Sequence, residues 1–406
     1  MNTMKLAIII PDGAADEPCE VLGGKTPIAA ANTPQGDAIA AAGLCGAANF
    51  VPAALPPGSD VAIMNLLGYD PVEYHTGRAA LEAAAAGIEL GPHDWAVRCN
   101  IVTIANQIMR SFTAGQIPTE EAAELLTSLA AFIDDSRIEF HPGVSYRNLM
   151  VYRGSEDEPA PFTDETRGTP PHDLTDKSVA DDHPRGPGSD LLCELMSASE
   201  RVFAGHEVNQ RRLAAGGTPA TNVWLWGLGR QPQLPPFTEK YGLRGAMITA
   251  VDLLRGLASL IGFARIDVPG ATAYLDTDYA AKGRYAVEAL NDFDLVCVHI
   301  EAPDEAGHEG DAAAKAEAIG RVDEHIVGPV WEALKSHGDY RILVTPDHPT
   351  PVRTKTHSRG DTPYAMCGTG IDRLGSPKWD ETTAEAQIAA WRFDPGWKLM
   401  ERFVGS

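Results

Sequence analysis

The sequence predicts an α/β fold, in which a doubly wound and mostly parallel sheet carries a smaller inserted α+β domain. Continuous apolar runs indicate strands buried on both faces, and segments with helical patterns alternate with these runs. A central stretch rich in Pro, Gly and Asp interrupts the alternation. The 406 residues suffice for two or three domains, or for one large core with an insertion.

Three apolar runs predict strands of the parallel sheet. They are residues 5–10, "KLAIII", residues 294–300, "DLVCVHI", and residues 340–345, "YRILVT". Runs without polar alternation are typical of strands that helices cover on both faces. The first run is too short for the apolar region of a signal peptide, and no stretch approaches the roughly 18 apolar residues of a membrane helix.

Two segments near these strands predict helices of the core. Residues 246–262, "AMITAVDLLRGLASLIG", show the spacing of an amphipathic helix. Residues 310–338 predict another helix, which has Asp311 as a possible N-cap and Gly338 just past its end.

Residues 93–217 differ from the rest of the chain in their high content of Pro, Gly and Asp, which are typical of turns and loops. They also contain a helical pattern, "TEEAAELLTSLAAFI", which Thr119 is placed to cap. We therefore expect a core formed by residues 1–92 and 218–406, with residues 93–217 as an inserted domain.

The charge balance restricts the partners that the protein can bind. Fifty-six acidic against 33 basic residues give a net charge of −23, and such a surface repels nucleic acids and anionic membranes. An anionic substrate would need a local cluster of Arg, Lys or metal. The six cysteines show no close spacing, which predicts reduced thiols in a cytoplasmic protein. The surface charge and the lack of a coiled coil make a monomer the expectation.

Carboxylate or imidazole side chains follow each of the three predicted strands and occur again in the last loop. They are Asp12, Asp304, His308, Asp347, His348 and His357. Ligands of open parallel sheets bind outside the carboxyl ends of the strands, so these residues are expected to converge. Each residue alone could be a helix cap, a turn residue or a solvated loop residue. Together their charges would repel one another without a cation, and Asp with His suits two ions such as Mn²⁺ or Zn²⁺.

Ser59 lies at a predicted helix start in "LPPGSDVAIMNLLGYD". It could be an N-cap, but a helix start also presents backbone N–H groups to a phosphate. A neighbouring metal would lower the pKa of the hydroxyl and make it a nucleophile, which completes an outline of phosphoryl transfer. The sequence lacks a P-loop, a dinucleotide-binding G-x-G-x-x-G after a strand, and a G-x-S-x-G elbow.

Longer stretches resemble the cofactor-independent (2,3-bisphosphoglycerate-independent) phosphoglycerate mutases of archaeal type, in the alkaline phosphatase superfamily. They include "PPGSDVAIMNLLGYDPVEYHTGRAALEA", "VHIEAPDEAGHEGD" and "TPDHPTPVRTKTHS", and the resemblance covers nearly the whole chain. It implies an alkaline-phosphatase-like core and an isomerase, an intramolecular phosphotransferase of glycolysis and gluconeogenesis. Such an enzyme interconverts 3- and 2-phosphoglycerate with two divalent metals (Mn²⁺, or else Mg²⁺, Co²⁺ or Zn²⁺) and without bisphosphoglycerate.

The resemblance also implies roles for single residues. Asp304, His308 and His357 would bind one metal ion. The ligands of the second ion would be Asp12, Ser59, Asp347 and His348. Ser59 would carry the phosphoryl group as phosphoserine while glycerate turns over, under an inserted domain that closes over the substrate. Expected substrate contacts are Lys240, Arg147, Arg98, His172 and Asp173.

Other functions remain open at the level of sequence. "SFTAGQIPTEEA" and "TPPHDLTDK" look nearer to a bacterial branch of the family proposed to act as homoserine kinase, which would take its phosphoryl group from a nucleotide. A phosphatase of the same superfamily is another alternative, whereas no sulfatase nucleophile motif is present. A metal-bound binding protein without activity is the non-enzymatic alternative.

Overall fold

The computed structural model describes residues 4–405 and divides the chain into two compact units. Unit 1 comprises Met1–His75 and Gln233–Ser406, and unit 2 comprises Thr76–Pro232. Unit 2 begins before and ends after the insertion expected at residues 93–217. The reason is that α5 (Arg78–Ala85) packs against β3 (Trp95–Ala105) and β7 (Asn222–Gly229) of its sheet, so a boundary at residue 92 or 218 would divide one core.

Unit 1 is built on an eight-stranded sheet, with strand order β13-β2-β12-β11-β1-β10-β8-β9. The strands are β1 (Lys5–Pro11), β2 (Leu44–Ala48), β8 (Gly245–Ile248), β9 (Ala264–Arg265), β10 (Leu295–Ile300), β11 (Tyr340–Val344), β12 (Thr362–Gly368) and β13 (Arg392–Phe393). All neighbours pair in parallel except β12, which is antiparallel to both β11 and β2. The predicted α/β fold with a mostly parallel sheet is confirmed.

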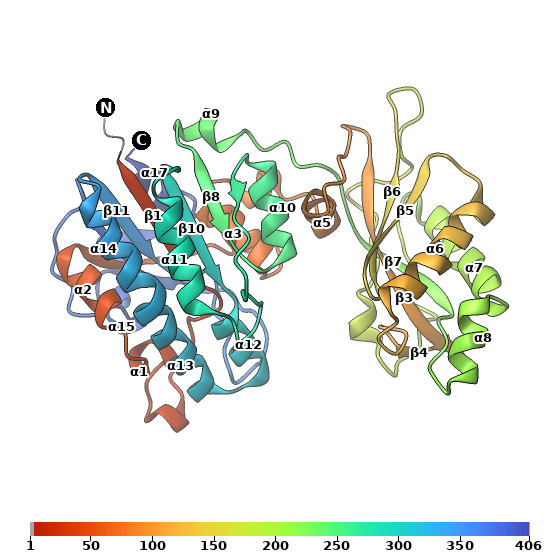
Figure 1. Cartoon of the computed structure of the whole chain (residues 1–406), viewed down its shortest axis with the longest axis horizontal. Coiled ribbons are helices and arrows are strands. Elements are labelled where there is room, and N and C mark those ends of the chain that lie inside the picture. The colour runs from red at the N-terminus through yellow and green to blue at the C-terminus, as the bar shows by residue number, and fades with distance from the viewer. Residues whose placement is uncertain (1–3, 406) are drawn as a thin grey trace. The chain divides into compact units, whose positions relative to one another are not determined.

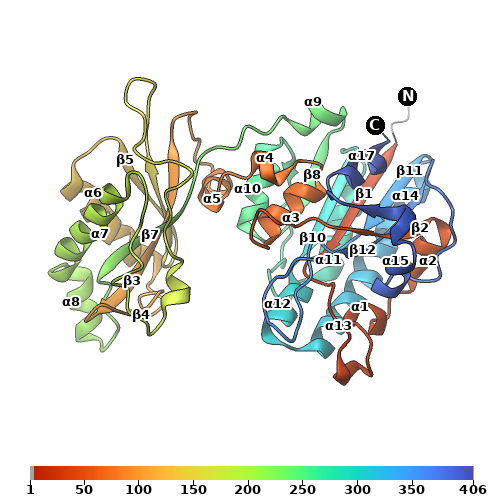
Figure 2. The ribbon, with the colours of Figure 1, turned by 180° about the vertical axis from the view of Figure 1, so that it is seen from behind.

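Helices cover both faces of this sheet. Figure 1 shows α11 (Tyr279–Ala289) and α14 (Gly328–Ser336) in front of the sheet, and the opposite view of Figure 2 shows α3 (Ser59–Leu66) in front of it. The adjacent residues Ile8 and Ile9 of β1 point to opposite faces, and both are fully buried. The remaining helices of unit 1 are α1 (Pro27–Ala30), α2 (Pro34–Ala42), α4 (Pro71–Tyr74), α9 (Phe237–Tyr241), α10 (Asp252–Leu260), α12 (Ala302–Glu309), α13 (Ala312–Val322), α15 (Glu381–Ala386), α16 (Ile388–Trp391) and α17 (Lys398–Val404).

The structure refines two of the helix predictions for unit 1. Residues 246–262 are not one helix, because their first residues form strand β8 beside β10 and the helix α10 begins only at Asp252. The helix predicted at 310–338 is capped by Asp311, whose side chain accepts the N–H groups of Ala313 and Ala314. It is divided into α13, a π-helical turn at Asp323–Val327, and α14.

The π-helical turn positions a buried carboxylate. The side chain of Asp323 accepts the backbone N–H groups of Gln35 and Gly36 at the start of α2, at 3.0 and 2.7 Å. The same turn brings the backbone oxygen of His325 close to α11, where a Cβ atom on Gly283 would lie 2.1 Å from it. The absence of a side chain at Gly283 therefore allows α11 and the turn to pack together.

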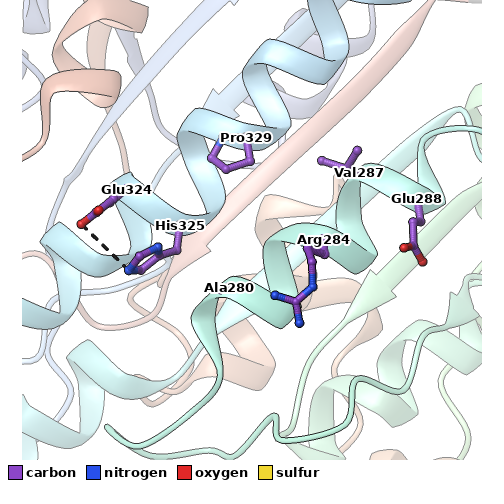
Figure 3. A pocket seen from close by; sticks show the side chains of 7 residues that line it. All are labelled: Ala280, Arg284, Val287, Glu288, Glu324, His325 and Pro329. Atoms are coloured by element: carbon purple, nitrogen blue, oxygen red, sulfur yellow. Dashed lines mark ion pairs between the residues drawn. The ribbon is translucent and has the colours of Figure 1, made fainter.

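A hollow of about 350 Å³ lies beside this contact. Figure 3 shows the side chains that line it, from α11 on one side and from the π-helical turn and Pro329 on the other. Its acidic and basic groups come from helices that cover the sheet, and Glu324 lies 3.9 Å from His325. It contains none of the predicted site residues. Among residues 4–405, no helix has both the length and the apolar character needed to cross a bilayer.

Unit 2 contains a five-stranded sheet in which the strands pair in an antiparallel manner, with the order β4-β3-β6-β5 and β7 paired to β3. The strands not yet described are β4 (Ile108–Ser111), β5 (Ile138–Val144) and β6 (Arg147–Tyr152), and the longer helices are α6 (Thr119–Ile133), α7 (Ser189–Ala204) and α8 (Glu207–Ala214). Thr119 does not cap α6, because it is already the first helical residue, and its hydroxyl accepts the N–H of Ser145 instead.

Candidate metal centre

The predicted site residues of unit 1 meet because β1, β10 and β11 are in parallel register. Ile9 lies opposite Val298 on one side and Val344 on the other, so the three strands end at one edge of the sheet. Asp12 directly follows β1. The loops and the helix after the other two strands add the remaining residues, which fall into two neighbouring groups.

The first group, which we call the first cation set, consists of Asp304, His308 and His357. Asp304 and His308 are one turn apart on α12, and the Oδ2 and Nε2 atoms lie 3.0 Å apart. His357, from the loop after β11, places its Nε2 3.0 Å from Nε2 of His308 and 3.4 Å from Oδ2 of Asp304. Three ligand-type atoms thus form a closed triangle. Asp304 is buried, whereas both imidazoles are partly exposed.

The second group, the second cation set, consists of Asp12, Ser59, Asp347 and His348. The three titratable side chains are fully buried. Nε2 of His348 is central: it lies 3.2 Å from the Ser59 hydroxyl oxygen, 3.5 Å from Oδ1 of Asp12 and 3.4 Å from Oδ2 of Asp347. The backbone places Asp347 firmly, because its Oδ1 accepts the N–H groups of Gly13 and His348 at 3.1 and 2.9 Å.

Both sets have the spacing that a cation requires. Ligand atoms about 2.1 Å from a tetrahedrally coordinated ion lie about 3.4 Å from one another. The separations of 3.0–3.5 Å within each set match this value. Within residues 4–405, Oδ1 of Asp12 and Oδ2 of Asp347 are buried and have no hydrogen-bond partner. Buried carboxylate oxygens left in this way need a positive partner, so the residues fit divalent cations.

The second set is electrostatically unfavourable by itself. Burial raises the pKa of Asp12 well above its usual range, and repulsion from Asp347 and Asp304 raises it further. Burial lowers the pKa of His348, so its imidazole is neutral and has a lone pair available. The set therefore concentrates negative charge without an internal counter-charge.

The first set supplies its own counter-charge. Burial opposes the ionisation of Asp304, but hydrogen bonds from His308 and His357 outweigh it and hold the pKa of Asp304 well below its usual range. The hydrogen bond to Asp304 in turn raises the pKa of His308 to about 9.

Gly13 links the two sets. Its N–H donates to Asp347, as described above, and its φ of 60° is a left-handed conformation that favours glycine. A Cβ atom at this position would lie 2.2 Å from Oδ1 of Asp304. The glycine of the "PDG" sequence is therefore required for the carboxylate of the first set to approach the second.

Ser59 is the first residue of α3, which follows the helix-breaking sequence Pro56-Pro57-Gly58. All eight residues of α3 are buried, so the helix is anchored along its whole length. Asp60 in the first turn lies 2.8 Å from Nε2 of His75, which ties the start of the helix to the end of this segment of unit 1. The hydroxyl of Ser59 thus stands at a helix N-terminus, which favours anionic ligands.

Three residues of the centre were missed by the sequence analysis. His299 and Glu301 group with Asp12, with ligand-type atoms all within 4.8 Å of one another. The Thr350 hydroxyl donates to Oδ1 of Asp304 and lies 3.2 Å from Nδ1 of His348. Glu301 directly follows β10, just as Asp12 follows β1, so the same rule could have identified it. His299 lies inside an apolar run, and no sequence signal distinguishes it from a core residue.

The predicted substrate contacts lie outside these two sets. Lys240 of unit 1 places its ammonium 4.9 Å from the ring centre of Tyr69. The others belong to unit 2, where Asp173 and Arg147 are exposed.

Arg98 and His172 of unit 2 flank Trp226. The guanidinium of Arg98 stacks on this ring at 4.0 Å, and the imidazole of His172 meets it edge-on at 5.6 Å. Arg98 is also paired with Glu82 at 2.9 Å. Trp226 and Glu82 were not predicted.

Comparisons with known proteins give one consistent result. A family profile described as 2,3-bisphosphoglycerate-independent phosphoglycerate mutase matches residues 40–209. A protein of that name from Methanothrix thermoacetophila is 47% identical over 94% of this chain and 95% of its own length. A probable 2,3-bisphosphoglycerate-independent phosphoglycerate mutase from Geobacter sulfurreducens is 43% identical over 99% of this chain and 100% of its own.

Solved structures show the same fold. A Pyrococcus horikoshii protein is similar with a TM-score of 0.80 and 29% identity, over 100% of this chain and 98% of that one. A cofactor-independent phosphoglycerate mutase from Thermoplasma acidophilum is similar with a TM-score of 0.68 and 24% identity, over the full length of both chains.

Proposed function

Since the chain belongs to the family of 2,3-bisphosphoglycerate-independent phosphoglycerate mutases, we propose that it interconverts 3- and 2-phosphoglycerate by way of a phosphoserine at Ser59. The single observation that carries the role of Ser59 is its place in the second cation set. Its hydroxyl oxygen lies 3.2 Å from Nε2 of His348, at the start of a fully buried helix. The reaction would serve glycolysis and gluconeogenesis in the cytoplasm, which agrees with six free cysteines.

The two cation sets would each hold one divalent ion, and we propose Mn²⁺ on the basis of their mixed carboxylate and imidazole ligands. When bound, the two ions would neutralise the carboxylates, lower the pKa of the Ser59 hydroxyl and attract the phosphoryl oxygens. The first set contributes Asp304, His308 and His357. The second set contributes Asp12, Ser59, Asp347 and His348.

The transfer itself needs only one nucleophile from the protein. The Ser59 hydroxyl gives up its proton as its oxygen forms a bond to phosphorus, the bond from phosphorus to the 3-oxygen of the substrate breaks, and that oxygen takes up a proton. Glycerate turns in the site, its 2-hydroxyl gives up a proton as its oxygen bonds to phosphorus, the bond from phosphorus to Ser59 breaks, and the Ser59 oxygen is protonated again. Residue Ser59 is only 8% exposed, so few water molecules can reach the phosphoserine.

Polar and charged side chains outside the cation sets are proposed to bind the substrate. Lys240 offers an ammonium group in unit 1. In unit 2, the guanidinium of Arg98 stacks on the ring of Trp226, the imidazole of His172 meets the same ring edge-on, and Arg147 and Asp173 are exposed. The pairing with Glu82 holds the planar guanidinium of Arg98 in place, and its remaining N–H groups form a rigid fork that can donate to an anion. The R98K variant loses this fork, so we expect it to raise KM more than it lowers kcat.

A paired assay tests the proposed function. The purified protein, loaded with Mn²⁺, is given 3-phosphoglycerate without bisphosphoglycerate, and the formation of 2-phosphoglycerate is followed. The same protein is given ATP and homoserine, and the formation of ADP is followed. We expect turnover only in the first assay. Turnover only in the second would replace the mutase by a homoserine kinase, and release of inorganic phosphate without isomerisation would indicate a phosphatase.

A further inference from the structure

His299 on β10 connects Asp12 to Thr249, the residue that follows the neighbouring strand β8. It is fully buried, and its Nε2 lies 2.7 Å from Oδ2 of Asp12. Its other ring nitrogen, Nδ1, lies 3.1 Å from the hydroxyl oxygen of Thr249, directly after β8. The chain of contacts therefore begins at a backbone turn and ends at a carboxylate of the second cation set.

The contacts of Thr249 and Asp12 together favour one tautomer of His299. The hydroxyl oxygen accepts the backbone N–H of Val251 at 3.1 Å, so its own hydrogen is available for Nδ1 of His299. Nδ1 then acts as an acceptor, and the ring hydrogen lies on Nε2. At 2.7 Å, a carboxylate oxygen needs a donor opposite it, and the hydrogen on Nε2 supplies one.

This arrangement argues against a third metal ion at Asp12, His299 and Glu301, although their ligand-type atoms lie within 4.8 Å of one another. A ring nitrogen that carries a hydrogen has no lone pair for a metal, and Nδ1 faces the hydroxyl. The backbone oxygen of His299 accepts the buried ammonium of Lys282 at 3.2 Å, which fixes the end of β10 as well. His299 is therefore held on both its side chain and its backbone.

We propose that Thr249 and His299 form a positioning relay, which holds Oδ2 of Asp12 by a hydrogen bond and thereby turns Oδ1 toward the second cation. Oδ1 has no hydrogen-bond partner in the described part of the chain, and it lies 3.5 Å from Nε2 of His348. The inference rests on the proposed second cation set. Neither residue of the relay touches the cation, and both act through the orientation of Asp12.

The test compares Thr249→Val with Thr249→Ser. Valine keeps the shape of threonine but removes the hydroxyl, whereas serine keeps the hydroxyl. Mn²⁺ alone is titrated into metal-free protein by calorimetry and by electron paramagnetic resonance. T249V loses the hydrogen bond to His299, and we expect the affinity for the second ion to fall by about 10- to 100-fold. T249S keeps this hydrogen bond and should retain wild-type affinity. The first cation set of the same molecule is the internal control, and its affinity should not change.

Two additions make the result specific. Repeating the titration in a His308→Asn background, which disables the first set, isolates the second ion. Nitrogen-15 spectra of histidine-labelled, metal-free protein report the hydrogen position directly: we expect His299 to carry it on Nε2 in the wild type and T249S, and to lose this preference in T249V. A purely structural role for Thr249 would not change the tautomer.

The outcomes separate the relay from the proposed function. A wild-type protein that binds fewer than two Mn²⁺ ions contradicts the cation sets themselves. Two ions in the wild type with equal second-ion affinity in T249V, or a hydrogen on Nδ1 of His299, contradicts the relay alone. If T249V does not fold, His299→Gln and His299→Leu replace it: the glutamine amide can still donate to Asp12 and should retain second-ion affinity that leucine loses, and equal affinities would contradict the relay.

Discussion

The first and second cation sets lie at the end of the same sheet, yet they balance charge differently. The first set joins one carboxylate to two imidazoles, and the attraction lowers the pKa of Asp304 and raises that of His308. The second set joins two buried carboxylates to one neutral imidazole, and burial with repulsion raises the pKa of Asp12. The first set is thus compatible with a metal-free fold, whereas the second set needs a bound cation to balance its carboxylates.

This difference indicates that the second set lowers the stability of the fold in exchange for a reactive site. Among residues 4–405, Oδ1 of Asp12 and Oδ2 of Asp347 are buried in the second set without a hydrogen-bond partner, and Ser59, the proposed nucleophile, belongs to the same set. Sites that bind and activate a substrate are commonly less stable than the fold could be. The half of the centre that carries out the transfer should therefore be the half that destabilises the metal-free protein.

The largest effect is expected at the nucleophile. Ser59→Ala should lower mutase activity by at least about 10⁴-fold, because the variant lacks the hydroxyl proposed to accept the phosphoryl group. Both Mn²⁺ ions should still bind, since the remaining ligands of the two sets are unchanged. Activity is measured by isomerisation of 3-phosphoglycerate and occupancy by metal analysis. Wild-type activity in S59A would contradict the phosphoserine and leave the second set without its proposed purpose.

The convergence of the site residues at one edge of the sheet could be predicted from the sequence. Parallel strands end at one edge, so the residues after "KLAIII", "DLVCVHI" and "YRILVT" had to converge. What could not be predicted is the division of charge, because it depends on burial and on contacts across strands. His299 lies within an apolar run, and its pairing with Asp12 requires the register of β1 and β10. The bounds of unit 2 differ from the expected insertion at 93–217 for a related reason: no sequence signal assigns α5 to the sheet of β3 and β7.

Removal of the metal ions should inactivate the enzyme completely. Excess EDTA is expected to abolish isomerisation, and added Mn²⁺ to restore it, because the carboxylates of the second set repel one another without a cation. Thermal denaturation should show a lower melting temperature after chelation. Full activity in the presence of excess EDTA would contradict both cation sets.

Matched asparagine substitutions test the comparison most directly. In the metal-free protein, Asp347→Asn should raise the free energy of unfolding by about 2 kcal/mol, because the amide oxygen can still accept from Gly13 and His348 while the repulsion with Asp12 disappears. His308→Asn should instead lower it by about 1 kcal/mol, because an attractive contact with Asp304 is lost.

Denaturant titration of both variants, each without metal, measures these changes. Activity should fall strongly in both, since each loses a ligand. Changes of the same sign in the two variants would show that the sets do not differ in charge balance as described.

Asp323, a buried carboxylate outside both cation sets, allows the effect of burial on a pKa to be measured without loss of a proposed metal ligand. Burial raises the pKa of Asp323 to about 6, although its oxygens accept two backbone N–H groups. Between pH of about 4 and 6 the folded protein then holds a proton that the unfolded chain has released, so the free energy of unfolding should fall by about 3 kcal/mol as the pH rises through this window.

Asp323→Asn should remove that part of the pH dependence while activity stays at the wild-type level. Urea denaturation at a series of pH values measures the slope. An equal slope in wild type and variant would show that burial does not raise the pKa of Asp323, and it would weaken the interpretation of Asp12.

Gly13 gives the centre a property that neither set has alone. Its peptide nitrogen holds Asp347, and the space where a side chain would be is filled by the carboxylate of Asp304. A side chain at this position would collide with the carboxylate of Asp304 and would strain the peptide that holds Asp347. An engineer who redesigns the ligands of either half therefore has to keep a glycine here, because one substitution at residue 13 would damage both halves at once.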